Sequence, residues 1–149
     1  MKSNLSFNLI IPLVFVWVGF ICAISFMEAW LKFQAPGVTT QIGLGIGRLI
    51  FSSLNKVEIF FSIAIILCLL KTKPMSSFVL SFLFLSITIL IVQSIWILPN
   101  LDERAKMIIE NIKIKESNSH IIYIILELVK VLGLISYGLI ILKNKLNGN

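Results

Sequence analysis

Long apolar runs alternate with short polar breaks along the chain. Four runs of mostly apolar residues cover about residues 8–30, 40–70, 76–98 and 120–142. About 20 such residues, as a helix, cross the roughly 30 Å hydrocarbon core of a bilayer. The runs show no two-residue alternation, and a bilayer accepts only helices and closed barrels, because their backbone groups are satisfied internally. We therefore predict an all-α fold, an integral membrane four-helix up-down bundle that forms a single domain over residues 1–149.

Composition supports this class of protein. The chain is 58% hydrophobic and only 13% charged, whereas soluble domains carry about 25% charged residues. A chain of 149 residues has too little interior to hide so much apolar surface from water. An ordinary soluble enzyme, a disordered chain and a disulfide-rich secreted module are therefore excluded. Cys22 and Cys68 lie singly in apolar runs, so we expect neither a zinc site nor dithiol chemistry.

The segment 100–115, between the third and fourth runs, is the most charged part of the chain. Leu101, Ala105, Ile108 and Ile112 recur in it at helical spacing, and charged residues occupy the other positions. This pattern is typical of an amphipathic helix. We expect a short helix between spans three and four that lies on the membrane surface or caps the bundle.

The distribution of lysines predicts how the bundle is oriented. Four crossings place both termini and the loop after the second span on one side of the membrane. That side carries five lysines and no acidic residue: Lys2, Lys71, Lys73, Lys143 and Lys145. Because excess Lys and Arg marks the cytoplasmic side, we expect a multi-pass protein of the bacterial cytoplasmic (inner) membrane with both termini in the cytoplasm. The chain has a net charge of +6, but its basic residues form no patch with interleaved aromatic residues. Nucleic acid is therefore not an expected partner.

Several polar residues fall inside the apolar runs. Arg48 and Glu58 lie in the second run, Gln93 in the third, and Glu127 and Lys130 in the fourth. An ionisable group near the bilayer centre costs about 2.5–3.5 kcal/mol on insertion scales, so such residues require partners and usually mark function. With a rise of about 1.5 Å per residue, all of them fall in the half of the bundle away from the termini.

Helical spacing predicts which way these residues face. His120, Tyr123, Glu127 and Lys130 follow steps of three or four residues, so they share one face of a helix. The second run has a similar stripe, and stripes that are polar at the same end are expected to converge inside a bundle. We expect a polar pocket in the outer half, with Glu58 and Glu127 as buried carboxylates and Arg48 and Lys130 as their charge partners. The candidate ligand-binding residues are Glu28, Arg48, Asn55, Glu58, Gln93, His120, Tyr123, Glu127 and Lys130.

Metal, cofactor and phosphate-loop chemistry lack their residues. The chain has one histidine, and no glutamate has a histidine three residues later, so the di-iron bundle motif is missing. We predict no metal site and no cofactor. Gly43, Gly45 and Gly47 alternate as G-x-G-x-G, without the strand and the Lys-Ser/Thr pair of a phosphate loop. Gly43 and Gly47 instead form a GxxxG step, which favours close helix packing.

Three functions and one purely structural interpretation fit these patterns. The preferred function is binding, with or without passage, of a small amphiphilic or anionic ligand beside membrane lipid. The second is a membrane enzyme that uses a glutamate or His120 as acid or base on a lipid-soluble substrate. The third is an assembly subunit that docks a partner membrane protein or a second copy. Structurally, the pairs Glu28–Lys32 and Glu127–Lys130 have spacings at which each pair neutralises itself, and buried polar contacts can simply hold spans together.

The chain also resembles known families. The segments Phe26–Gly37, Gly43–Arg48 and Asn55–Glu58 look like those of uncharacterised bacterial four-span membrane proteins. The later Trp96-Ile-Leu-Pro99, followed by His120 and Glu127, resembles the cisplatin-resistance-associated transmembrane protein domain family. The polar linker here is shorter than in that family, and the second span is more charged. The resemblance implies a four-helix fold and no particular activity.

Overall fold

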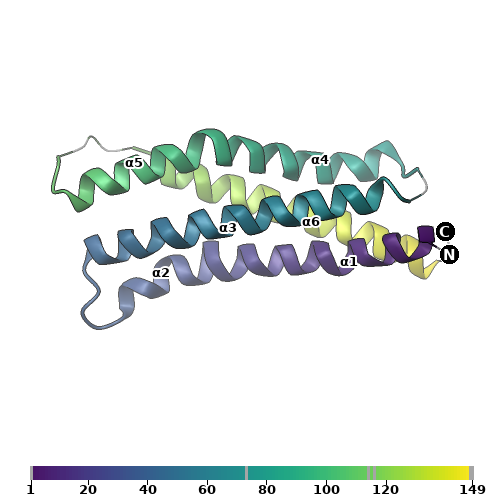
Figure 1. Cartoon of the computed structure of the whole chain (residues 1–149), viewed down its shortest axis with the longest axis horizontal. Helices are drawn as coiled ribbons and strands as arrows, with labels where there is room; N and C mark the ends of the chain where they lie inside the picture. The colour runs from purple at the N-terminus through teal and green to yellow at the C-terminus, as the bar shows by residue number, and fades with distance from the viewer. Residues whose placement is uncertain (1, 73, 114, 116, 148–149) are drawn as a thin grey trace.

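Most of the described chain is helical (Figure 1). The computed structural model describes residues 2–72, 74–113, 115 and 117–147. No strand occurs among these residues. The elements in chain order are α1 (Lys2–Ile21), a π-helical turn η1 (Cys22–Glu28), α2 (Ala29–Leu31), a 3₁₀ turn η2 (Lys32–Gln34), α3 (Thr40–Leu69), α4 (Ser77–Val92), a second π-helical turn η3 (Gln93–Ile97), α5 (Leu98–Ile109) and α6 (Ser119–Leu146).

The elements form four antiparallel rods with both termini at one end (Figure 1). In the described part of the chain, four helical stretches are long and apolar enough to cross a membrane: Leu5–Gln34, Thr40–Leu69, Ser77–Ile109 and Ser119–Leu146. α6 packs against α1 and α4, and α3 packs against α1 and α5. The predicted all-α four-helix membrane bundle is therefore confirmed, and the chain is a multi-pass membrane protein.

The outward face of the bundle is apolar. Leu49, Phe60, Ile95 and Leu132 are all largely exposed and come from three different rods. Monomeric soluble proteins rarely expose continuous apolar surface of this kind. Such a surface is suited to lipid chains rather than to water.

The third rod extends past the predicted end of the third span. We expected that span to end at Pro99, and the helix continues past this residue through α5 to Ile109. The predicted amphipathic helix is α5, and it continues in line with α4 along α3 instead of lying apart as a separate surface helix. The reason is the π turn before Pro99, where Leu98 N–H already bonds Gln93 five residues back. A proline ring without an N–H is accommodated where the regular helical ladder is interrupted.

Local capping explains where the helices of the outer end begin and stop. Thr39 caps α3, its side chain accepting a bond from Ile42 N–H at 3.3 Å. α5 closes with Asn111 at a positive φ of 59°. There Ile112 N–H bonds the Met107 carbonyl at 2.9 Å, the pattern of a Schellman motif. The predicted second span, 40–70, agrees with α3 to within one residue, and the predicted fourth span, 120–142, begins within one residue of the start of α6 and ends four residues before its end. The predicted first span, 8–30, is shorter than the helical stretch Leu5–Gln34.

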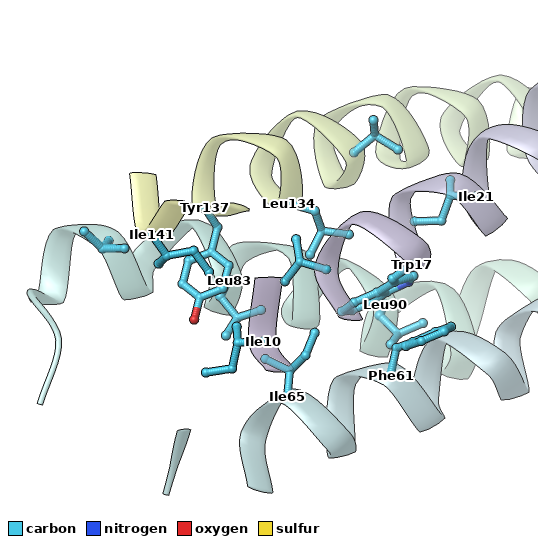
Figure 2. Packing of buried hydrophobic residues seen from close by; sticks show 13 residues of the cluster. Ile10, Trp17, Ile21, Phe61, Ile65, Leu83, Leu90, Leu134, Tyr137 and Ile141 are labelled. Carbon is cyan, nitrogen blue, oxygen red and sulfur yellow. The ribbon is translucent and has the colours of Figure 1, made fainter. Parts of the chain in front are cut away.

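The half of the bundle near the termini has a dense apolar core (Figure 2). Ile65, Leu83, Leu134 and Ile141 are fully buried there and point toward one another from three rods. Gly133 allows α6 to approach α4, because a Cβ at that position would lie 2.6 Å from the Ser86 hydroxyl oxygen. Close backbone approach of this kind drives helix association in lipid, where hydrophobic burial contributes little. This core leaves the polar residues to the other half.

Candidate functional site

Four polar side chains meet in the interior of the bundle: Glu58 of α3, Gln93 of η3, and Glu127 and Lys130 of α6. We call these residues the ion cluster. The Lys130 ammonium is 0% exposed and lies 2.6 Å from Glu58 Oε1 and 3.1 Å from Glu127 Oε1. It also donates to Gln93 Oε1 at 2.7 Å. An ammonium has three N–H donors, so three oxygen partners satisfy it.

The first rod also reaches the ion cluster, through Trp17 of α1. Its indole Nε1–H donates to Glu58 Oε1 at 3.0 Å, and the side chain is fully buried. Gln93 Nε2 donates to Glu127 Oε1 at 3.2 Å, so this amide bridges the lysine and the second carboxylate. Trp17 was not among the predicted site residues, and it lies within the first apolar run. A buried indole N–H requires an acceptor, and that requirement was the available signal.

One oxygen of the ion cluster has no hydrogen-bond partner among the described residues. It is Oε2 of Glu127, which is buried. The Tyr123 hydroxyl lies beside the Glu127 carboxylate and pairs with the Ser25 hydroxyl of η1 at 3.3 Å. Buried polar atoms in proteins are nearly always paired, so an unpaired carboxylate oxygen calls for an explanation.

A pocket of about 580 Å³ lies at the end of the bundle away from the termini. We call it the outer pocket. Its walls come from η2, α3, α5 and the start of α6, with apolar contributions from Phe33, Phe51 and Leu98. Its polar lining consists of Lys32, Arg48, Ser52, Asn55, Ser94, Asp102, His120 and Tyr123.

Glycines allow one wall of the outer pocket to form. A Cβ at Gly43 would overlap the ring of Phe33, and one at Gly47 would lie 3.2 Å from Lys32 Nζ. The lysine therefore reaches into the bundle, where its ammonium lies 5.3 Å from the centre of the Phe51 ring. It also pairs with Glu28 Oε2 at 3.2 Å. The predicted GxxxG step thus receives side chains of the chain's own first rod.

Arg48 does not pair with the buried carboxylates, contrary to the sequence prediction. Its guanidinium bonds both oxygens of Asp102 on α5, and Lys106 approaches the same carboxylate at 2.9 Å. Arg48 precedes Glu58 by ten residues, which is about 15 Å along a helix. The extended third rod brings Asp102 opposite Arg48, and this extension was not predicted.

The nine predicted residues therefore divide into two layers. Glu58, Gln93, Glu127 and Lys130 form the ion cluster; Arg48, Asn55, His120 and Tyr123 line the outer pocket; Glu28 reaches the pocket only through Lys32. His120 is exposed at the pocket, and Asn55 accepts a bond from the Ser94 hydroxyl at 2.7 Å. Tyr123 belongs to both layers, since it lines the pocket and its hydroxyl lies beside Glu127.

Both π turns contribute to these layers. Ser25 lies in η1 and Gln93 in η3, and both are buried. Single π turns inside α-helices frequently occur at functional sites, because they rotate side chains away from the regular helical positions. Prediction from helical periodicity assumes regular helices, so the two π turns were not predicted.

The described residues contain no group of three or more His, Cys, Asp or Glu side chains that could hold a metal ion. No family model matches the chain, and neither does any curated protein or solved structure. The resemblance to the cisplatin-resistance-associated family therefore stays a prediction. The fold and site define a polytopic four-helix membrane protein with a polar pocket above a buried ion cluster.

Proposed function

We propose that the outer pocket binds a small anionic amphiphile at the outer leaflet of the bacterial inner membrane, with both termini in the cytoplasm. The observation that carries the proposal is the placement of Lys32 and Arg48 in one pocket that also has aromatic and aliphatic walls. Its volume of about 580 Å³ lies in the usual range for small-molecule sites. The lysines at the terminal end support this orientation.

The charges around the pocket favour an anionic headgroup. Among the described residues, the ion pairs of Lys32, Arg48 and Lys106 are with two carboxylates, those of Glu28 and Asp102. One positive charge is therefore in excess, and the Lys32 side chain is only 9% exposed. Arg48 uses two of its five N–H donors on Asp102, so further donors remain for a ligand oxygen.

The interior below the pocket supports binding rather than passage. The ion cluster lies beneath Tyr123, and Leu83 and Leu134 are fully buried further toward the termini. A ligand that enters the outer pocket therefore meets a packed interior. The apolar walls at Phe33, Phe51 and Leu98 suit a short hydrocarbon tail.

Three probes with the same tail and different headgroups test this proposal: dodecanoate, dodecanol and dodecyltrimethylammonium. Binding is measured by native mass spectrometry on the protein in nanodiscs. We expect dodecanoate to bind most tightly, and Lys32→Gln or Arg48→Gln to weaken it by about tenfold, the effect of losing one charge-assisted hydrogen bond.

Lys56→Gln is the matched control, because Lys56 is an exposed lysine of α3, the helix that carries Arg48, and it lies outside the pocket. Equal binding of the three probes would overturn the proposal. So would a loss in Lys56→Gln as large as that in the pocket variants.

The assembly hypothesis rested on the GxxxG step and on the apolar half near the termini; it has lost the first of these and stays an untested alternative. Gly43 and Gly47 are buried against Phe33 and Lys32, so this face is not open to a partner helix. The enzyme hypothesis stays an untested alternative, and turnover of a bound lipid-soluble substrate would favour it over simple binding.

A further inference from the structure

We propose that the ion cluster is a proton-binding site, with the proton on Glu127 Oε2 exchanging through the outer pocket past Tyr123. The ion cluster does not balance its own charge when every group is ionised. Two carboxylates and one ammonium leave one negative charge when all three are ionised, and Lys130 and Glu127 are fully buried. An uncompensated charge is strongly unfavourable away from water. One bound proton removes it.

Hydrogen bonding assigns the proton to Glu127. Glu58 Oε1 receives Lys130 at 2.6 Å and Trp17 at 3.0 Å, two donors that stabilise an ionised carboxylate. Glu127 Oε1 receives longer bonds, from Lys130 at 3.1 Å and Gln93 at 3.2 Å. Its Oε2 has no partner among the described residues. A protonated Oε2 becomes a donor, and the neighbouring Tyr123 hydroxyl is able to accept.

All elements packed around Glu127 fit this assignment. The charged groups that face it are Glu58 from α3 and Lys130 from α6, and the titratable Tyr123 lies on its own helix. Among the described residues, the other side chains that hydrogen-bond the two carboxylates are neutral: Gln93 from η3 and Trp17 from α1. Ser25 from η1 bonds Tyr123. Lys130 is therefore the only cation that these contacts bring to the two carboxylates.

Tyr123 provides the route for exchange. Its side chain lines the outer pocket, and its hydroxyl lies beside Glu127. A proton from pocket water reaches Glu127 when the hydroxyl releases its own proton to the carboxylate and takes another from water. Toward the termini, buried Leu134 and Tyr137 fill the interior. Exchange is therefore expected from the pocket side.

The bound proton also deepens the proposed function, and this step rests on it. An anion in the outer pocket is repelled by a net negative ion cluster beneath it, and protonation removes that repulsion. Because coupling between two sites is reciprocal, the protonated form binds the anion more tightly. We expect dodecanoate affinity to fall roughly fivefold or more when the pH rises and Glu127 loses its proton.

Infrared spectroscopy of the purified protein in nanodiscs tests the proton without any ligand. We expect a protonated-carboxyl stretch in the wild type that is lost in Glu127→Gln and kept in Glu103→Gln, an exposed carboxylate serving as control. Glu127→Gln has the size and neutrality of the protonated acid, so it is expected to fold. Tyr123→Phe keeps the ring and should slow hydrogen–deuterium exchange of the band.

Three results would overturn the proton site. They are the lack of the band in the wild type, its persistence in Glu127→Gln, and its removal by sodium at constant pH, which would indicate a metal cation instead. The coupling is tested separately in a His120→Gln background, because His120 lines the outer pocket and is itself titratable. In that background, over the pH range in which dodecanoate is ionised, adding Glu127→Gln should abolish the remaining pH dependence of dodecanoate binding. A wild-type band without dodecanoate binding contradicts the proposed function alone, whereas dodecanoate binding without a band contradicts the proton site alone.

Discussion

The two halves of the bundle are built from the same four rods but use different interactions. Near the termini, fully buried side chains such as Ile65, Leu83 and Leu134 pack without charge, and Gly133 draws α6 against α4. Away from the termini, the ion cluster and the outer pocket occupy the interior. The terminal half can therefore hold the rods together while the outer half carries polar groups that a bilayer would otherwise exclude.

The difference between the two halves predicts which substitutions affect folding and which affect binding. In the terminal half, the described interior is closely packed and mainly apolar, so substitutions there should act on folding. In the outer half, the ion cluster combines both roles, because its contacts join all four rods. The outer pocket lies at the rim, where the Arg48–Asp102 pair is partly exposed and contributes little to stability.

Lys130→Met should have the largest effect. It leaves Glu58 and Glu127 buried without their ammonium, and breaking a buried ion pair costs about 3–5 kcal/mol. The measurement is the unfolding midpoint in detergent. Adding Glu58→Gln should recover part of the loss, and Lys56→Met should change little. An unaltered midpoint in Lys130→Met would show that the ion cluster does not stabilise the bundle.

Trp17→Phe should come next. It keeps an aromatic ring and removes the hydrogen bond to Glu58, and a hydrogen bond to a charged group contributes about 1.5–3 kcal/mol. Trp30→Phe is the control, because Trp30 is exposed. The free energy of unfolding in both variants measures the difference. Equal losses would mean that ring size, and not the indole N–H, matters at residue 17.

Gly133→Val tests the terminal half. Its Cβ would lie 2.6 Å from the Ser86 hydroxyl oxygen and 3.2 Å from the Phe82 carbonyl, and overpacking of this kind costs about 1–3 kcal/mol. We expect a lower unfolding midpoint with dodecanoate affinity retained in the folded fraction. Gly19→Ala has open space around it and should not destabilise the protein. Loss of affinity without loss of stability would contradict the division into two halves.

Asp102→Asn should have the smallest effect on stability and an opposite effect on binding. The pair with Arg48 is partly exposed, so its loss should change the free energy of unfolding by about 1 kcal/mol or less. Removing the carboxylate frees the guanidinium, so dodecanoate should bind more tightly. Glu103→Gln removes a neighbouring exposed charge as control. Weaker dodecanoate binding in Asp102→Asn would argue that Asp102 positions Arg48 for the ligand.

The sequence alone determined the class of protein and the inward faces of its helices. Apolar runs of bilayer length leave helices as the natural solution, because lipid offers no partner for free backbone groups. Of the predicted stripe, Tyr123, Glu127 and Lys130 are buried, because a helix repeats every 3.6 residues wherever it packs, and His120 at its outer end is exposed. Local geometry therefore sufficed for these features.

Only the tertiary structure decided which polar groups meet. Arg48 and Lys130 were equivalent cations in the sequence. The partner of Arg48 depends on how far the third rod extends beyond Pro99, whereas Lys130 meets carboxylates of α3 and α6. The π turns and the bond from Trp17 to Glu58 have no periodic signature. Contacts between residues distant in the chain depend on rotations and lengths summed over whole helices. The one pocket expected from the sequence is therefore an ion cluster with a separate pocket above it.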